Sequence, residues 1–237
     1  MNKCDICTHK DNCTLIPKNN KSIACMLFEK KERELINYPE FKTFAKISRL
    51  SRDIIITEKI DGTNGLIYID ENNNIFAGSR NRWLDDHTDN HGFYHWVMDN
   101  KEELLKLGKG YHYGEFWGKG IQRGYGLEEK RFSLFNVGRW CMWNEEPKVI
   151  SINPKTQEKK YQERAPKCCC LVPILYEGQI YLQDFYAPNE FITYLKLNGS
   201  KAAPGFMNPE GVVIYHKHGN VYFKKTILND DKGKDAS

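Results

Sequence analysis

The chain has 237 residues with a hydrophobic content of 40% and an aromatic content of 13%, which is typical of a globular domain and excludes a disordered chain. Its formal net charge of +4 fits a phosphate-rich partner without requiring one. No apolar run approaches the roughly 20 residues that span a bilayer, and the N-terminus lacks the apolar core of a signal peptide. We therefore expect no membrane partner and a cytoplasmic location.

Residues 1–37 are predicted to form a separate cysteine-rich segment. Its four cysteines have the spacing C-x2-C-x5-C-x11-C, and they are Cys4, Cys7, Cys13 and Cys25. In an intracellular protein such thiols are more often metal ligands or buried groups than disulfides. Four thiolates can hold a structural Zn²⁺ ion, and they can also hold an iron–sulfur cluster. The alternative is a polar arm that carries free thiols.

The most informative segment is residues 57–65, Thr-Glu-Lys-Ile-Asp-Gly-Thr-Asn-Gly, which follows three isoleucines. A lysine at a strand end, here Lys59, can attack the α-phosphate of a nucleotide when its amine is neutral. Asp61 can accept a hydrogen bond from a ribose hydroxyl, and Gly62 lets the backbone approach a ligand. The alternative interpretation is a charged strand end followed by an Asp-Gly hairpin turn.

The pattern of residues 38–228 predicts one domain of strands and short helices, followed by a polar tail at 229–237. We expect the strands at 54–57 and 65–70 to pair around the Asp-Gly turn. The other expected strands are 75–79, 111–116, 132–137, 171–176, 211–216 and 221–225, and the expected helices are 93–107 and 187–197. Residues 144–166 are polar and contain prolines, which predicts a loop.

Further candidate residues follow these strands. Arg80, with Arg82 as the second choice, lies after the third strand and could bind a phosphate through two parallel hydrogen bonds. Glu115 lies on a strand with apolar neighbours, and Glu210 directly precedes one. The glycine-rich residues 119–126 favour a flexible surface loop over a catalytic element.

Two pairs of neighbours leave a choice open. Phe132 and Phe135 lie on one expected strand, and either ring could serve a flat ligand or pack in the core. Lys224 and Lys225 are adjacent on the closing strand, so their side chains point to opposite faces. Only one of the two lysines can enter a given cleft, and we favour Lys224.

Together these segments resemble the covalent lysine nucleotidyltransferase superfamily of polynucleotide ligases and mRNA capping enzymes, whose first motif is Lys-x-Asp-Gly. Asn64 is similar to the RNA ligase branch, because DNA ligases usually carry arginine at that place. The resemblance covers residues 41–228 and implies an α+β, ATP-grasp-like fold. In that fold, twisted and mainly antiparallel sheets with flanking helices hold ATP in the cleft between them.

The resemblance also implies roles for the residues. It assigns Lys59 as the nucleophile, Asp61 to the ribose, Glu115 to the ribose or a cation, Glu210 to Mg²⁺ or Mn²⁺, and Lys224 to the α-phosphate. The residues that it implies for ATP binding are Glu58, Ile60, Asn64, Arg80, Phe135 and Lys225, and Phe135 would stack on the purine. The chain departs from the family at Asn136, where aspartate is common, and at its adjacent lysines, where Lys-x-Lys is frequent.

The implied activity is ATP-dependent joining of 5′-phosphate and 3′-hydroxyl RNA ends, nicked or single-stranded, through a covalent lysyl-AMP and an adenylylated 5′ end. DNA ligases and capping enzymes carry an oligonucleotide-binding barrel after the closing strand. Only 12 residues follow Lys225, too few for such a barrel, which favours an RNA ligase over those two classes. A non-catalytic nucleic-acid-binding protein with the same fold is the other alternative, although it would have no need for Lys59.

Overall fold

The computed structural model describes residues 39–179 and 187–230 of the chain. The chain divides into two units, Met1–Lys46 and Ile47–Ser237. In the first unit the described residues, 39–46, are exposed and form no helix or strand. The predicted cysteine-rich segment, including all four of its cysteines, lies outside the described residues, and every element below belongs to the second unit.

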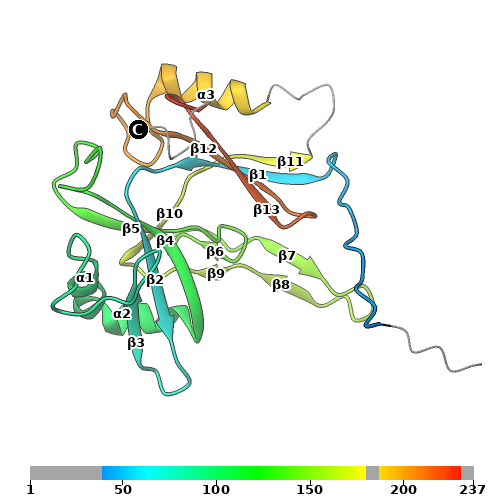
Figure 1. Ribbon diagram of the computed structural model, residues 1–237, viewed down its shortest axis with the longest axis horizontal. Coiled ribbons are helices and arrows are strands. Elements are labelled where there is room, and N and C mark those ends of the chain that lie inside the picture. The colour runs from blue at the N-terminus through cyan, green and yellow to red at the C-terminus, as the bar shows by residue number, and fades with distance from the viewer. Residues whose placement is uncertain (1–38, 180–186, 231–237) are drawn as a thin grey trace, which may run out of the picture. The chain divides into compact units, whose positions relative to one another are not determined.

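One layer of the second unit is a four-stranded antiparallel sheet in the order β11-β1-β12-β13. Its strands are β1 (Asp53–Lys59), β11 (Ile174–Gln179), β12 (Gly211–His216) and β13 (Val221–Thr226). Helix α3 (Ala187–Asn198) covers one face, where Ile54, Ile56 and Val212 pack against Ile192 and Leu195 (Figure 1). Because successive side chains of a strand point to opposite faces, Ile55, Thr57 and Lys59 of β1 lie on the other face of the sheet.

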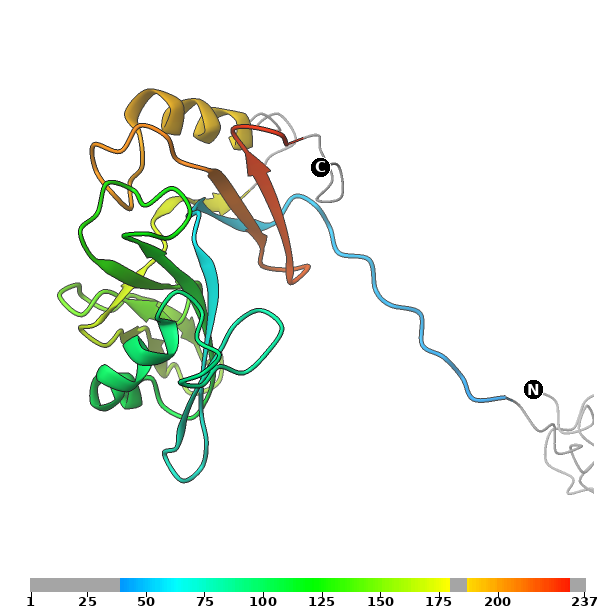
Figure 2. The same ribbon diagram turned by 60° about the vertical axis from the view of Figure 1, so that its left-hand side comes forward.

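The second layer is a five-stranded sheet in the order β10-β5-β4-β2-β3. Its strands are β2 (Thr63–Ile69), β3 (Ile75–Gly78), β4 (Gly110–Gly118), β5 (Lys130–Leu134) and β10 (Cys169–Leu171). All of its pairs are antiparallel except the β10–β5 pair. Its core packs against helices α1 (Phe93–Asp99) and α2 (Lys101–Leu104) and the 3₁₀ turn η3 (Leu105–Leu107), and Figure 2 shows the helices grouped beside β2 and β3.

A third apolar cluster joins the two sheets. It includes Ile55 from β1, Trp117 from β4, Ile60 from the link between β1 and β2, and Tyr125 from the loop after β4. Burial of these large side chains holds the two sheets in a fixed arrangement. Two mainly antiparallel sheets with flanking helices confirm the predicted α+β class.

The lysine motif differs from the predicted hairpin. β1 and β2 do not pair with each other, because β1 lies in the four-stranded sheet and β2 in the five-stranded sheet. Residues 60–62 therefore cross from one sheet to the other. A Cβ atom added at Gly62 would lie 2.4 Å from the Phe116 carbonyl oxygen, so glycine is required here by close packing against β4.

Two other predictions of secondary structure were wrong. Residues 144–166, predicted as a loop, contain β7 (Val149–Ile152), β8 (Lys159–Tyr161) and β9 (Glu163–Arg164); β7 pairs with β8, and β9 pairs with β6 (Trp140–Cys141). The expected strand at 171–176 is divided at Val172 and Pro173, because proline has no N–H to donate to a sheet. Its two halves enter different sheets as β10 and β11. Among the described helices, none is long and apolar enough to cross a membrane.

Candidate active site

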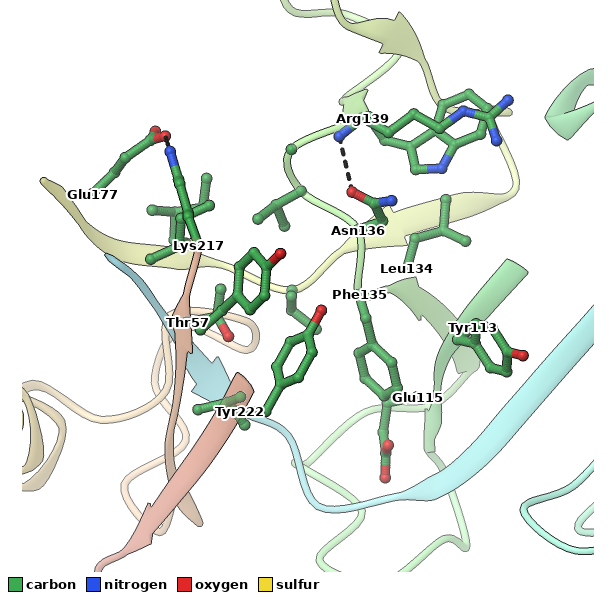
Figure 3. Close-up of a pocket in the computed structure, with 18 of the residues that line it drawn as sticks. Thr57, Tyr113, Glu115, Leu134, Phe135, Asn136, Arg139, Glu177, Lys217 and Tyr222 are labelled. Atoms are coloured by element: carbon green, nitrogen blue, oxygen red, sulfur yellow. Dashed lines mark hydrogen bonds and ion pairs between the residues drawn. The ribbon is translucent and has the colours of Figure 1, made fainter. Parts of the chain in front are cut away.

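A cavity of 1110 Å³ lies between the two sheets, with side chains from both in its wall. Figure 3 shows Phe135 and Glu115 approaching it from the five-stranded sheet and Tyr222 from β13 of the other sheet. The predicted site residues that line the cavity are Glu58, Lys59, Ile60, Asn64, Glu115 and Phe135. Six positions that are distant in sequence thus share one cavity.

Lys59, the last residue of β1, lies against Glu210. The register of β1 and β12 pairs Lys59 with Gly211, which places the preceding residue, Glu210, beside the lysine amine. Lys59 Nζ donates to Glu210 Oε2 at 2.6 Å, and both side chains are mostly buried. The predicted nucleophile and the predicted metal-binding carboxylate are therefore in direct contact.

Glu115 is a buried carboxyl group beside this pair, with an exposed fraction of 8%. It accepts hydrogen bonds from the Gly62 N–H at 3.0 Å and from Asn64 Nδ2 at 3.3 Å. Burial raises the pKa of Glu115 to about 7, although attraction to Lys59 and the Gly62 hydrogen bond oppose the shift. The group therefore changes charge near neutral pH.

Asp61 is held by the loop at residues 119–126. Its carboxylate accepts from Arg123 Nε at 2.8 Å, and its backbone N–H donates to the Tyr125 hydroxyl at 2.8 Å. Arg123 Nη1 also donates to the carbonyl and side-chain oxygens of Asn208, two residues before Glu210. Tyr125 is buried, so the prediction of a flexible surface loop was wrong. Arg123 and Tyr125 therefore occupy the hydrogen-bonding groups of Asp61, and Asp61 is not among the residues that line the cavity.

Glu58 is almost fully buried, with its carboxylate directed at the segment after α3. It accepts from Ser200 Oγ at 2.6 Å and from the backbone N–H groups of Lys201 and Ala202 at 2.7 and 2.9 Å. Burial raises the pKa of Glu58, and these hydrogen bonds oppose the shift. The carboxylate therefore fixes residues 200–202 against the end of β1.

The structure separates the two candidate aromatic residues. Phe132 is fully buried and packs on Phe93 in the core of the five-stranded sheet. Phe135 is 39% exposed and lines the cavity. Tyr222 of β13 also lines the cavity (Figure 3), and its ring stacks on that of Tyr215 with a centroid distance of 4.5 Å. Phe135 is thus the ring that a flat ligand can reach, and Tyr222 is an additional candidate that the sequence did not single out.

The β12–β13 register likewise separates the two lysines. Lys224 pairs with Val213, which lines the cavity, so Lys224 lies on the cavity-facing side of β13 together with Tyr222. Lys225 lies on the opposite side and donates to Asp230 Oδ2 at 2.9 Å. Arg80 is exposed in the turn after β3 and is not among the residues that line the cavity.

Within residues 39–179 and 187–230, no group of three or more histidine, cysteine, aspartate or glutamate side chains is arranged to hold a metal ion. Glu210 nevertheless fits a Mg²⁺ or Mn²⁺ site of the kind that uses one or two carboxylates together with phosphate oxygens and water. The zinc site predicted for Cys4, Cys7, Cys13 and Cys25 lies outside the described residues and stays a prediction.

Fold and cavity together define a two-sheet α+β protein in which Lys59 and Glu115 line the cavity and Glu210 contacts Lys59. The family model for RNA ligase matches residues 52–227, so the chain belongs to the RNA ligase family. This result confirms the resemblance to the covalent nucleotidyltransferase superfamily. No curated protein matched the chain.

Solved structures of Naegleria gruberi RNA ligase are similar to this chain. A lysine-to-alanine variant with ATP and Mn is 19% identical, has a TM-score of 0.49, and is matched over 73% of this chain and 48% of that chain. A lysine-to-methionine variant with AMP and Mn is 20% identical, has a TM-score of 0.48, and is matched over 78% of this chain and 53% of that chain. This chain therefore spans about half the length of those RNA ligases.

Proposed function

We propose that the chain is an ATP-dependent RNA ligase that joins 5′-phosphate and 3′-hydroxyl RNA ends through a lysyl-AMP. The observation that carries the proposal is the position of Lys59: it lies at the end of β1, on the wall of a cavity large enough for a nucleotide, where it contacts Glu210 and attracts the Glu115 carboxylate. Membership of the RNA ligase family supports the same activity.

The proposed reaction has three steps. The neutral Lys59 amine attacks the α-phosphorus of ATP; an N–P bond forms, the bond to the bridging oxygen breaks, and pyrophosphate leaves. The AMP then passes to the 5′-phosphate of an RNA strand, and the lysine amine is restored. Finally a 3′-hydroxyl attacks that 5′-phosphate, the phosphodiester forms, and AMP leaves.

The residues around Lys59 have separate tasks in this scheme. Glu210 accepts the hydrogen bond that orients the amine, and the amine must leave this ion pair and lose a proton before it attacks.

Lys224 supplies fixed positive charge on the cavity side of β13. The exposed ring of Phe135 would stack on adenine. Glu115 would bind the ribose, and hydrogen bonds from Asn64 and the Gly62 backbone hold its carboxylate in place. A bound Mg²⁺ or Mn²⁺ would offset negative charge on the phosphate oxygens.

The scheme makes RNA ends the partner, and a cytoplasmic location stays part of the proposal. Incubation with α-labelled ATP and Mg²⁺ should label the protein, and Lys59→Ala should abolish the label. Lys106→Ala, which removes an exposed lysine that is not among the residues lining the cavity, should label normally. A panel of 5′-phosphorylated RNA and DNA nicks then identifies the strands that are joined. A protein that binds RNA but never becomes labelled would be a non-catalytic member of the family.

A further inference from the structure

The five-stranded sheet has one covered face and one face with exposed aromatic side chains. On the covered face, Ile67, Ile69 and Ala77 are buried in the core cluster that includes residues of α1 and α2. The alternating positions on the other face carry aromatic rings. These rings, here called the aromatic stripe, are Tyr68 on β2, Phe76 on β3, Tyr111 and Tyr113 on β4, and Trp83 after β3.

The rings of the stripe form a continuous series. Tyr68 stacks on Tyr111 with a centroid distance of 4.5 Å, and Tyr111 stacks on Tyr113 at 6.4 Å. In the other direction Phe76 lies 6.0 Å from Tyr68, and Trp83 lies 6.2 Å from Tyr68. Apart from Tyr68, which is half-buried, each ring is 44 to 56% exposed. A contiguous set of exposed rings is unusual for a surface without a partner.

The stripe is continuous with the candidate active site. Tyr111, Tyr113 and Glu115 occupy alternating positions of β4, so their side chains lie on one face of the strand, and all three line the cavity. Figure 3 shows Tyr113 and Glu115. Asn64, which donates to Glu115, is on the same face of β2 as Tyr68. The stripe therefore begins at the cavity and extends away from it across β4, β2 and β3.

The turn before Trp83, at the end of the stripe away from the cavity, contains positively charged residues. The Ser79 N–H donates to the Arg82 carbonyl at 2.8 Å, which closes a turn that brings Trp83 back against Gly78. Arg80 and Arg82 are both exposed in this turn, and Arg82 directly precedes Trp83 in sequence. Aromatic faces beside a cation are the elements that bind single-stranded nucleic acid, because every base has a face for stacking and every linkage has a phosphate.

We propose that the aromatic stripe binds the bases of a single-stranded RNA segment that leads to the strand end at Lys59. This inference rests on the proposed function, which makes RNA ends the substrate. The continuity of the stripe with the cavity, and the exposed Arg80 and Arg82 in the turn that precedes Trp83, favour RNA over a second copy of the chain as the occupant. The stripe positions the strand, and the reacting groups remain those of the cavity.

The test uses the full chain with the double substitution Phe76→Thr and Tyr68→Thr. Neither residue lines the cavity, and threonine is compatible with a strand, so the sheet should be retained. Two controls accompany it: Phe76→Tyr keeps a ring at the same place, and Tyr194→Thr removes an exposed tyrosine from α3. Binding of a short, unstructured, 5′-phosphorylated and fluorescently labelled RNA is followed by anisotropy, with self-labelling by α-labelled ATP measured alongside.

We expect the double variant to bind this RNA at least about fivefold more weakly, with an unchanged salt dependence because no charge is removed. Phe76→Tyr and Tyr194→Thr should bind as the parent does, and all variants should label normally with AMP. Unchanged RNA affinity in a folded, normally labelled double variant overturns the inference and leaves the proposed function intact. A change of oligomeric state without a change of affinity would assign the stripe to contact between copies. A parent that never labels contradicts the proposed function instead.

Discussion

Lys59 Nζ lies 2.6 Å from Glu210 Oε2, although 151 positions separate the two residues in sequence. The contact follows from the pairing of β1 with β12, which ends at Lys59 opposite Gly211. Backbone hydrogen bonds of the sheet therefore fix the distance between the two charges. The first prediction concerns this contact, because the Lys59 amine must leave it before the amine can attack a ligand.

Glu210→Gln should lower the rate of AMP transfer to the protein by about 100-fold, because it removes the carboxylate that orients the Lys59 amine and that would hold the divalent cation, while nearly preserving side-chain size. Rapid-quench labelling with α-labelled ATP measures this rate. Glu128→Gln, which removes the carboxylate from an exposed ion pair with Lys119, is the matched control and should have little effect. Equal rates for the two variants would argue against a role for Glu210 in the first step.

Glu115 should make the stability of the protein depend on pH. Its pKa in the folded protein is about 7, above the ordinary value of 4.5, so the unfolded chain loses this proton first as pH rises. The free energy of unfolding should fall between these two values by about 2 to 3 kcal/mol at most. Glu115→Gln cannot ionise and should flatten that part of the profile in urea unfolding at a series of pH values. An unaltered profile would show that Glu115 is not the responsible group.

Lys224 and Lys225 form a natural pair for comparison, because they are adjacent in sequence and lie on opposite faces of β13. Lys224→Ala should reduce AMP transfer by about 100-fold, since it removes charge from the cavity side. Lys225→Ala removes a half-buried ion pair with Asp230 and should mainly lower stability, by about 1 kcal/mol. Labelling rates and thermal unfolding of both variants distinguish the effects. The reverse order of activities would contradict the register argument.

Gly62→Ala should destabilise the fold by about 2 kcal/mol or more, because the added Cβ would meet the Phe116 carbonyl oxygen at 2.4 Å. Gly138→Ala is the control, since the nearest atom to its added Cβ lies at 3.5 Å, an ordinary contact. Chemical denaturation of both variants gives the comparison. Equal stabilities would mean that the close approach of residue 62 to β4 is not required.

The local elements could be predicted where the chain has a strong pattern. The expected strand at 221–225 lies within β13, and the expected helix at 93–107, with its recurring apolar residues, corresponds to α1, α2 and η3. The separation of β1 and β2 into two sheets could not be predicted. An Asp-Gly dipeptide is compatible with a hairpin, and only contact with Phe116, distant in sequence, forces the chain to cross between sheets.

In the candidate site too, contacts between residues distant in sequence could not be predicted. Lys59, Glu115 and Glu210 were identified from short motifs, since each lies beside a strand with characteristic neighbours. Arg123 was missed because its partners, Asp61 and Asn208, are 62 and 85 positions away, and a glycine-rich sequence by itself favours a flexible loop. The one available signal was Tyr125 between two glycines, an aromatic residue that a solvated loop has no reason to contain.

The central claim is that Lys59 becomes covalently joined to AMP. Mass spectrometry of the intact protein after incubation with ATP and Mg²⁺ tests it most directly, followed by fragmentation to locate the modified residue. The account predicts an added AMP mass on the peptide that contains Lys59, and its loss in Lys59→Ala. An unmodified parent protein under these conditions, or an AMP that persists in Lys59→Ala, would contradict it.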